Sequence, residues 1–470
     1  MIADLKPYAE YKESGLPWLG QVPRHWSVRR IKTVLRETDC RSADGTGTLL
    51  SLTRIRGLIP HGDMTDKMHS ARTLEGYKRY RAGQLVMNRL QAWSGMFGAG
   101  SIDGLVSPDY AVFDVLGGHA IKLVLQRLKT PDMVAQFALE SKGIGSGFNR
   151  LYTDRFGPIP ISLPPPAEQA AIVSFLDWAN GRLERAIRAK RKVIALLNEQ
   201  KQAIIHHAVT RGLDPFVPLK PSGIPWLGDI PQHWEVRKIK SLARTVGGMT
   251  PNKAVERYWD GTTPWVSPKD MKVPEIFDSQ DHISDAALRE TNICLLSGPA
   301  VLIVVRGMIL ARMFPTAVTR VPVTINQDMK ALVPRPELSV EFFALLLTGI
   351  QLELLELVEI AGHGTCCLRT DSWAAFCLPI PPLGEQAAIR SFLSTELATS
   401  NAAISRLQRE IDLLREYRTR LVADVVTGKL DVREAATGLP DEAAPDTSAE
   451  LAGDMLDDAS NLDEVEAEEI

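Results

Sequence analysis

Two duplicated blocks constrain the fold of this chain more than any other feature. The segment Ser14–Lys32, SGLPWLGQVPRHWSVRRIK, matches Ser222–Lys240, SGIPWLGDIPQHWEVRKIK, with 13 identities in 19 positions at an offset of 208. Glu168–Thr210 and Glu385–Thr427 align without a gap over 43 residues, with 16 identities at an offset of 217. A chain that repeats its framework in this way is expected to fold as two similar halves.

The segments between the paired blocks, residues 33–167 and 241–384, do not resemble each other in the same way. The composition, 45% hydrophobic and 24% charged residues, is that of a globular protein. At 470 residues, the chain is too long for one ordinary hydrophobic core. A duplicated framework that holds two dissimilar inserts therefore predicts a protein that recognises two different targets.

The distribution of charge matters more than the net charge of −3. Residues 434–470 contain 13 Asp and Glu and no Lys or Arg, so residues 1–433 carry a net charge of +10. A basic body is the electrostatic prerequisite for binding nucleic acid, although many proteins that bind none share it. The acidic tail, 433–470, is poor in aromatic residues and is predicted to be disordered.

Composition also bears on the compartment. No apolar run approaches the ~20 residues of a membrane span, and the first ten residues, MIADLKPYAE, contain no signal-peptide hydrophobic region. The five cysteines form no CxxC pair, which favours reduced, intracellular thiols. The nine histidines do not fall at ligand spacing near those cysteines, so we expect no metal site.

Prolines mark the borders of two long helices. Residues 164–166 and 381–382 are prolines that end strand-like segments and can open a helix, because proline is tolerated in its first turn. Short apolar runs between turn residues predict mixed α/β domains in the inserts. The predicted segments are connectors at 1–37 and 214–245, α/β domains at 38–163 and 246–381, long helices at 164–213 and 382–432, and the tail.

Apolar residues recur at heptad spacing along both helices. The predicted seam consists of Ile187, Ile194, Leu197, Ile204, Ile404, Leu407, Ile411, Leu414, Leu421 and Val425. Two such helices most simply pack on each other, and the alternative is that each packs on its own domain. The long connection between them allows a parallel or an antiparallel pair. An antiparallel pair would relate the repeats by a pseudo-two-fold axis, and 43 helical residues would extend about 65 Å.

A search for catalytic motifs is negative. The sequence contains no GxxxxGK[ST], HExxH, GxSxG or EF-hand pattern, and no convincing nuclease carboxylate cluster. The glycine-rich segment 143–147 has no strand–helix context and is predicted to be a loop. We therefore expect no catalytic residue and no cofactor in this chain.

The inserts carry side chains suited to DNA, because Arg, Asn and Gln can pair with base edges. The candidates in the first insert are Arg54, Arg56, Asn88, Arg89, Gln91, Ser94, Tyr110, Arg150 and Tyr152. Those in the second are Ser267, Lys269, Asp270, Arg306, Asn326, Gln327, His363 and Arg369. The alternative for each is ordinary: an aromatic such as Tyr110 packs in a core, and a single loop arginine is simply solvated.

From about residue 10 to 432, the chain resembles the specificity (S, HsdS) subunit of type I restriction–modification systems. The resemblance rests on the paired (S)G(L/I)PWLG and P.HW.V..IK blocks and on the paired PPxxEQxxI helices. The segments MNRLQAWSGMFGA, VSPDYAVF, TPWVSPKDM and INQDM also look like target-recognition domains of that family. The acidic tail departs from the family pattern.

The resemblance implies α/β (α+β) target-recognition domains, two per chain, joined by two long antiparallel coiled-coil helices as a pseudo-two-fold internal repeat. Each domain would recognise one half of an asymmetric, bipartite site in double-stranded DNA, and the helices would set the spacer. The expected partners are two methyltransferase (M) subunits and two restriction/translocase (R) subunits, in the cytoplasm and at no membrane. S-adenosylmethionine, ATP and magnesium would belong to those partners.

Two other classes of function remain open at this point. A free-standing methyltransferase–nuclease lacks any supporting motif. A structural coiled-coil scaffold explains the helices but leaves the two dissimilar inserts without a role.

Overall fold

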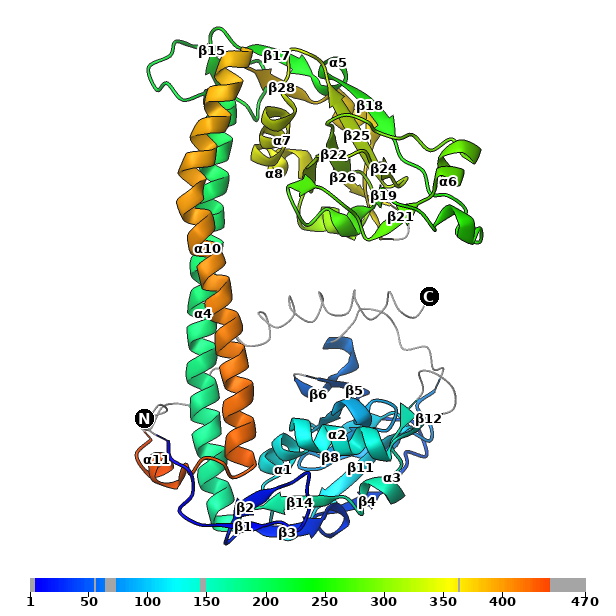
Figure 1. The fold of residues 1–470 in the computed structure, drawn as a ribbon, viewed down its shortest axis with the longest axis vertical. Helices are drawn as coiled ribbons and strands as arrows, with labels where there is room; N and C mark the ends of the chain where they lie inside the picture. Colours follow the sequence, from blue (N-terminus) through cyan, green and yellow to red (C-terminus); the bar gives the residue numbers. More distant parts are fainter. Residues whose placement is uncertain (1–4, 55, 64–72, 144–148, 362–363, 440–470) are drawn as a thin grey trace. The chain divides into compact units, whose positions relative to one another are not determined.

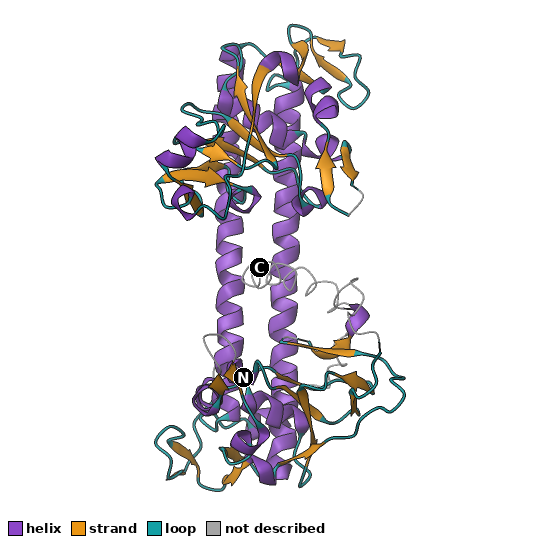
Figure 2. Ribbon diagram, turned by 90° about the vertical axis from the view of Figure 1, so that its right-hand side faces the viewer, coloured by secondary structure: helices purple, strands orange, loops and turns teal. Residues whose placement is uncertain are grey.

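The computed structural model describes residues 5–54, 56–63, 73–143, 149–361 and 364–439. The chain divides into two compact units, one formed by Met1–Ala189 with Glu410–Ile470 and the other by Lys190–Arg409. Each unit combines one α/β domain with part of both long helices (Figures 1 and 2). The units are therefore not the halves of the linear sequence, because the second helix returns its end to the first unit.

The two long helices are α4 (Pro166–Arg211) and α10 (Leu383–Val426). Both begin directly after prolines, and both are followed by a glycine with a positive φ angle, Gly212 (φ 78°) and Gly428 (φ 81°). Glycine adopts this left-handed conformation without the strain of a Cβ, and so it commonly ends a helix. The predicted boundaries, 164–213 and 382–432, enclose both helices.

The helices run antiparallel, as predicted. In the first unit, Ile172 near the start of α4 shares a buried core with Val425 near the end of α10. In the second unit, Val209 near the end of α4 shares a core with Ile389 near the start of α10. An ion pair between Arg418 and Glu184 at 3.2 Å adds a polar contact in the first unit.

Burial along the predicted seam is uneven. Ile187, Ile411, Leu421 and Val425 are buried, whereas Ile194, Leu197, Ile204, Ile404, Leu407 and Leu414 are half-buried. Leu421 and Val425 belong to the core of the first α/β domain as well.

The first unit is built around a four-stranded antiparallel sheet of order β4–β11–β8–β9. Its strands are β1 (Tyr11–Glu13), β2 (Gln21–Pro23), β3 (Ser27–Arg30), β4 (Leu35–Thr38), β5 (Leu50–Thr53), β6 (Gly57–Pro60), β7 (Lys78–Tyr80), β8 (Leu85–Asn88), β9 (Phe97–Gly98), β10 (Gly104–Val106), β11 (Tyr110–Val115), β12 (Lys142–Gly143), β13 (Asn149–Arg150) and β14 (Pro160–Leu163). Its short helices include α1 (Ile121–Leu128), α2 (Pro131–Glu140) and α3 (Thr153–Phe156).

Both faces of this sheet are covered. In β8, Leu85 and Met87 point into the larger core of the unit, and Val86 points into a smaller cluster with Leu50 and Tyr80. Successive residues of a strand point to opposite faces, so a sheet covered on both sides needs a continuous apolar run. This is why the sequence of β8 is uninterrupted by polar residues until Asn88.

The second unit contains a five-stranded sheet of order β18–β25–β22–β23–β20 and a three-stranded sheet of order β21–β19–β24. Its strands are β15 (Leu219–Pro221), β16 (Asp229–Pro231), β17 (Glu235–Lys238), β18 (Ala243–Gly247), β19 (Thr263–Val266), β20 (Glu275–Ile276), β21 (Asp281–Ile283), β22 (Val301–Val304), β23 (Thr316–Thr319), β24 (Thr324–Ile325), β25 (Met329–Pro334), β26 (Val358–Ile360), β27 (Cys366–Leu368) and β28 (Cys377–Ile380). Its shorter helices include α5 (Ile239–Leu242), α6 (Asp285–Glu290), α7 (Val340–Gly349), α8 (Gln351–Leu355) and α9 (Thr370–Ala375).

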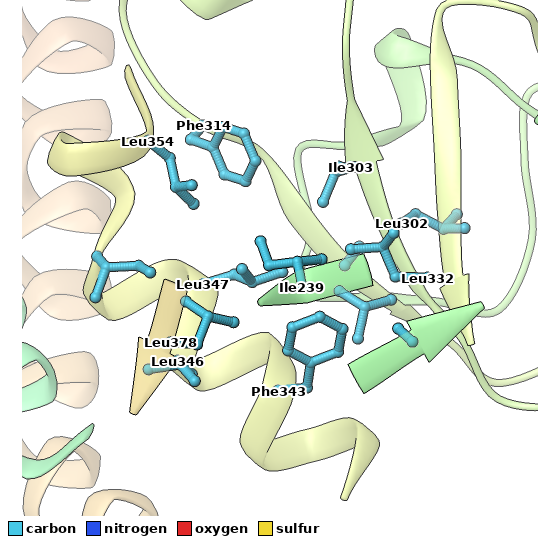
Figure 3. Packing of buried hydrophobic residues seen from close by; sticks show 14 of the residues in the cluster. Ile239, Leu302, Ile303, Phe314, Leu332, Phe343, Leu346, Leu347, Leu354 and Leu378 are labelled. Carbon is cyan, nitrogen blue, oxygen red and sulfur yellow. The ribbon is translucent and has the colours of Figure 1, made fainter. Parts of the chain in front are cut away.

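Helix α7 supplies much of the core of the second unit. Phe343, Leu346 and Leu347 are buried in one cluster with Leu302 of β22 and Leu332 of β25, as Figure 3 shows. A helix that is apolar on most sides must be surrounded by protein. The segment Phe342–Leu347 is therefore part of a central helix.

The two inserts share a topology despite their different sequences. In each, the first strand after the connector (β4 or β18) pairs with a later strand (β11 or β25), and that strand pairs with the intervening one (β8 or β22). Two helices, a short hairpin, another helix and an edge strand then follow in the same order. The edge strands β14 and β28 pair with the connector strands β3 and β17.

The chain after α10 differs from the prediction of disorder from residue 433. Helix α11 (Arg433–Thr437) follows α10, and Ala435, Ala436 and Leu439 pack against the core of the first unit. The apolar residues at the start of this segment explain its order. The remaining predicted tail, 440–470, lies outside the described residues.

Candidate nucleic-acid interface

The repeated Glu-Gln pair at the start of each long helix forms a joint. Glu168 of α4 is buried and accepts hydrogen bonds from the Tyr8 hydroxyl (2.5 Å) and from Trp26 Nε1 (3.0 Å), while His25 Nε2 lies 2.6 Å from it. Glu385 of α10 is held in the same way in the second unit. Its carboxylate accepts from Nε1 of the connector tryptophan at 3.0 Å and lies 2.8 Å from the connector histidine.

The glutamine of each pair fastens the α/β domain to the same helix start. Gln169 Oε1 accepts from the backbone N–H of Ala120, directly before α1, at 2.8 Å. Gln386 Oε1 accepts from the backbone N–H of Ser339, directly before α7, at 2.9 Å. Both glutamine side chains also donate to the preceding proline carbonyls. The repeated motif is thus a structural joint between connector, long helix and α/β domain.

The loop that follows β8 and the loop that follows β22 occupy matching places in the two units. The β8–β9 loop, residues 89–96, and the β22–β23 loop, residues 305–315, both follow the innermost strand. The backbone carbonyl of Arg89 accepts from the N–H of Leu151 after β13 at 2.9 Å, and that of Val305 accepts from the N–H of Leu368 in β27 at 2.8 Å. Each loop therefore lies beside the following hairpin of its own unit.

The β8–β9 loop gathers four of the predicted DNA-binding residues. The Arg54 guanidinium donates to the carbonyl and the hydroxyl of Ser94 at 3.0 and 3.1 Å. The Ser94 hydroxyl donates to the Gln91 carbonyl at 2.9 Å, and Asn88 Nδ2 donates to Gln91 Oε1 at 3.0 Å. The structure therefore brings Arg54, Asn88, Gln91 and Ser94 into one connected polar cluster, in which Arg54 and Gln91 are exposed.

Lys129, at the end of α1, joins this cluster although the sequence did not single it out. Its Nζ donates to the Arg54 carbonyl at 3.2 Å. Burial, together with the nearby Arg54 charge, lowers the pKa of Lys129 to about 8. Two cations lie close together here, which is an arrangement suited to phosphate groups.

The other candidates of the first unit have partners within the protein. Arg89 donates to Glu37 at 2.6 Å, and Arg150 pairs with Asp109 at 3.2 Å and lies 5.9 Å from the centre of the Tyr152 ring. Arg56 donates to a backbone carbonyl at 3.4 Å. Tyr110 packs against the smaller core cluster, where burial raises the pKa of its hydroxyl.

Several candidates of the second unit stabilise turns. Asp270 accepts from the backbone N–H and the hydroxyl of Ser267 at 2.8 and 3.0 Å, forming a capping box before a short 3₁₀ helix. Asn326 accepts from the backbone N–H of Asp328 at 3.0 Å, and Gln327 accepts from the hydroxyl of Thr250.

The remaining candidates of this unit are cations and one histidine. Lys269 and Arg306 are exposed, and neither makes an ion pair with any described residue. Arg369 lies 4.0 Å from Glu359. His363 lies outside the described residues.

Comparisons with known proteins match this framework. A family model described as Type I restriction modification DNA specificity domain matches residues 231–412. The EcoR124I/EcoR124II type I restriction enzyme specificity subunit of Escherichia coli is 27% identical over 266 residues. The MjaIX type I specificity subunit of Methanocaldococcus jannaschii is 29% identical over 173 residues. Residues 231–412 therefore match a type I restriction–modification DNA specificity domain, and the chain is similar to specificity subunits of those systems.

The alignments cover only part of these relatives. That with the Escherichia coli specificity subunit covers 56% of this chain and 60% of the relative, and that with the archaeal one covers 36% and 39%. The family model spans the second α/β domain and more than half of α10.

Fold comparison extends the likeness over most of the chain. A chain of a solved structure described as "Structural basis underlying complex assembly and conformational transition of the type I R-M system" matches with a TM-score of 0.58 at 16% identity. The match covers 87% of this chain and 99% of that chain. At 16% sequence identity, this structural match shows a shared fold and nothing more.

The sequence does contain a signal for the two loops, β8–β9 and β22–β23. Arg89–Phe97 and Arg306–Phe314 share an arginine at the start and Met-Phe at the end, at the same offset of 217 that relates the long helices. Three matches in nine positions are too few to establish a repeat on their own. They become meaningful because the strands on both sides of the loops are also equivalent.

No described helix combines the length and the apolar character that a membrane span requires.

Proposed function

We propose that this chain is the DNA sequence-reading subunit of a type I restriction–modification complex. Each α/β domain recognises one half of an asymmetric, bipartite site in double-stranded DNA, and the long helices set the spacer and dock the methyltransferase subunits. One observation carries the proposal: equivalent joints hold two domains of the same topology that present different side chains from equivalent loops.

The polar cluster of the first unit supports recognition of base edges. Asn and Gln can pair bidentately with adenine, Arg can pair bidentately with guanine, and Ser can contact either. Arg54 and Gln91 are exposed in the cluster, and Trp93 beside them is 40% exposed. The same loop therefore offers hydrogen-bonding groups and an aromatic surface.

Exposed apolar residues on the long helices support docking of two copies of one partner. Leu196 of α4 and Leu413 of α10 occupy equivalent repeat positions and are 53% and 57% exposed. Val193 and Tyr417 are also exposed and lie within one helical turn of these leucines. An exposed leucine at the same position of each repeat suits two identical protein surfaces.

The methyltransferase subunits would supply S-adenosylmethionine chemistry, and two restriction/translocase subunits would supply ATP- and magnesium-dependent cleavage. We expect this chain to contribute recognition without catalysis. Methyl transfer to DNA by the purified chain alone would overturn that division of labour.

Exchange of one domain tests the proposal. Residues 38–163 are replaced by the equivalent region of another specificity subunit, and methylated adenines are mapped across the genome. One half of the recognised sequence should change, while the other half and the spacer length stay the same. An unchanged methylated sequence after a folded exchange would contradict the proposal, and deletion of the chain is the control that should abolish the motif.

A further inference from the structure

We propose that the second α/β domain recognises its half-site partly through an apolar contact, in which Met308 packs against the C5-methyl group of a thymine. This inference rests on the proposed function and adds a specific reading residue to it. Hydrogen-bonding side chains dominate the equivalent loop of the first unit. The two domains would therefore read DNA by different chemistry from the same place in the fold.

The position of Met308 follows from the shared topology. Gln91 in the β8–β9 loop and Met308 in the β22–β23 loop are each two residues after the arginine that starts the common pattern. Both loops follow the innermost strand and hydrogen-bond to the next hairpin of their own unit. The hairpin hydrogen bonds are accepted by Arg89 and Val305, so the structure places Met308 within one residue of the position of Gln91. A residue at this place should face the same kind of ligand.

The loop presents Met308 to solvent while its own anchors are buried. Met308 is 63% exposed and Met313 is 44% exposed, whereas Leu310 and Phe314 lie in the core of the second unit. Gly307 has a φ of 143°, a conformation that other residues rarely adopt, and its N–H bonds the Cys366 carbonyl. The exposure of Met308 is thus held by a glycine turn and two buried side chains.

The charges around Met308 favour DNA as the occupant. Arg306 and Arg312 flank it, both are exposed, and neither makes an ion pair with any residue that the structure describes. Two unneutralised guanidinium groups attract phosphates. A flexible thioether between them suits the thymine methyl, which is the apolar feature of the major groove.

Deoxyuridine substitution tests this contact, because it removes only the methyl group. The half-site of the second domain is first identified by exchanging residues 246–381 and mapping the methylated sequence. The chain, assembled with its methyltransferase subunits, is then titrated with duplexes in which each thymine of that half-site is replaced singly by deoxyuridine. One replacement should weaken binding by about fourfold, the expected effect of one buried methyl group.

The variant M308A should bind the thymine duplex about as weakly as the wild type binds that deoxyuridine duplex, and should not distinguish the two. L352A is the matched control, because Leu352 of α8 is also 63% exposed, and it should keep the wild-type difference. Replacements in the other half-site should be insensitive to M308A.

Two results would overturn the inference while leaving the proposed function intact. In the first, binding is sequence-specific but no single deoxyuridine weakens it, or M308A still distinguishes the two duplexes. In the second, M308A weakens assembly with the methyltransferase and leaves DNA discrimination unchanged. Failure of the domain exchange to alter the methylated sequence would instead contradict the proposed function itself.

Discussion

At the residue scale, the repeated glutamates show how equivalent positions can contribute differently to stability. Glu168 is 6% exposed and has three polar neighbours, whereas Glu385 is 27% exposed and has two. The difference arises because Tyr8 has no bonding counterpart in the second unit, where the repeat places Phe216, which is fully at the surface. Burial and the Glu168 carboxylate raise the pKa of the Tyr8 hydroxyl, so it stays a donor.

Replacement of Glu168 by glutamine should therefore cost more stability than the same change at Glu385. We expect E168Q to lower the free energy of unfolding by about 2–3 kcal/mol, because an amide offers one acceptor and places an N–H group among donors. E385Q should cost about 1 kcal/mol or less, since solvent partly replaces the lost bonds. Urea unfolding of both variants measures this, and equal losses would contradict the argument.

Lys129 predicts a pH dependence of DNA binding by the first domain. Its pKa is about 8 in the free protein, so it is mostly charged at pH 7 and mostly neutral at pH 9. Binding should weaken as pH rises through 8, and the slope of log affinity against log salt should fall by about 1. The arginine of K129R stays charged, so this variant should lose the pH dependence. If K129R kept the wild-type pH profile, Lys129 would not be the group that causes the pH dependence.

At the element scale, close approach between helices decides how the second α/β domain attaches. Gly349 at the end of α7 lies against α4, where an added Cβ would come within 2.7 Å of Val209 and 3.1 Å of Ile205. Gln202 of α4 donates to the carbonyls of Thr348 and Gly349 at 2.9 Å each. A small residue and a bridging amide together fix this crossing.

A larger side chain at this crossing should loosen the attachment. We expect G349V to cost about 1–3 kcal/mol, because overpacking forces α7 away from α4 and weakens both Gln202 bonds. G384A is the matched control in α10, since nothing lies within 4 Å of a Cβ there. Urea unfolding should show a loss for G349V and little or no loss for G384A, and the reverse order would refute the close-approach argument.

At the scale of the whole molecule, the two ends of the described chain meet in the first unit. The N–H of Asp431 donates to the Lys6 carbonyl at 2.8 Å, and the Tyr11 hydroxyl donates to the Gly428 carbonyl at 3.1 Å. Gly428 packs on Pro23 and Trp26, as Gly212 packs on Pro231 and the connector tryptophan in the second unit. After Gly212, the backbone itself joins the long helix to the next connector. After Gly428, hydrogen bonds and packing hold the corresponding connector in place.

A circularly permuted chain should therefore fold and recognise the same DNA. Leu439 is joined to Leu5 by a short Gly/Ser linker, and the chain is opened between Pro215 and Phe216 on the exposed connector. Exposed loops tolerate new ends, because few backbone contacts are lost. Methylation mapping should return the original site. Opening between Leu302 and Ile303 in the buried strand β22 is the control that should abolish folding.

Much of the framework could be predicted from sequence because its signals are local. Prolines before and glycines after a heptad pattern indicate where α4 and α10 begin and end, and these depend only on neighbouring residues. Packing of the two helices on each other was predicted from their amphipathic pattern. That pattern allows a parallel or an antiparallel pair, and the antiparallel one was chosen because it relates the repeats by a pseudo-two-fold axis. The helix at residues 433–437 was not predicted, because it packs on a core that is assembled from segments far apart in the sequence.

The duplication by itself determined that this protein has two similar halves, a repeated connector and two long helices. Only the tertiary structure decided that the dissimilar inserts share one sheet topology, because different apolar sequences can fill the same strands. It also decided which polar side chains are engaged internally, as in Ser267 and Asn326, and which remain exposed, as in Arg306 and Gln91. Hydrogen-bond partners are set by contacts between residues far apart in the chain, which no local pattern records.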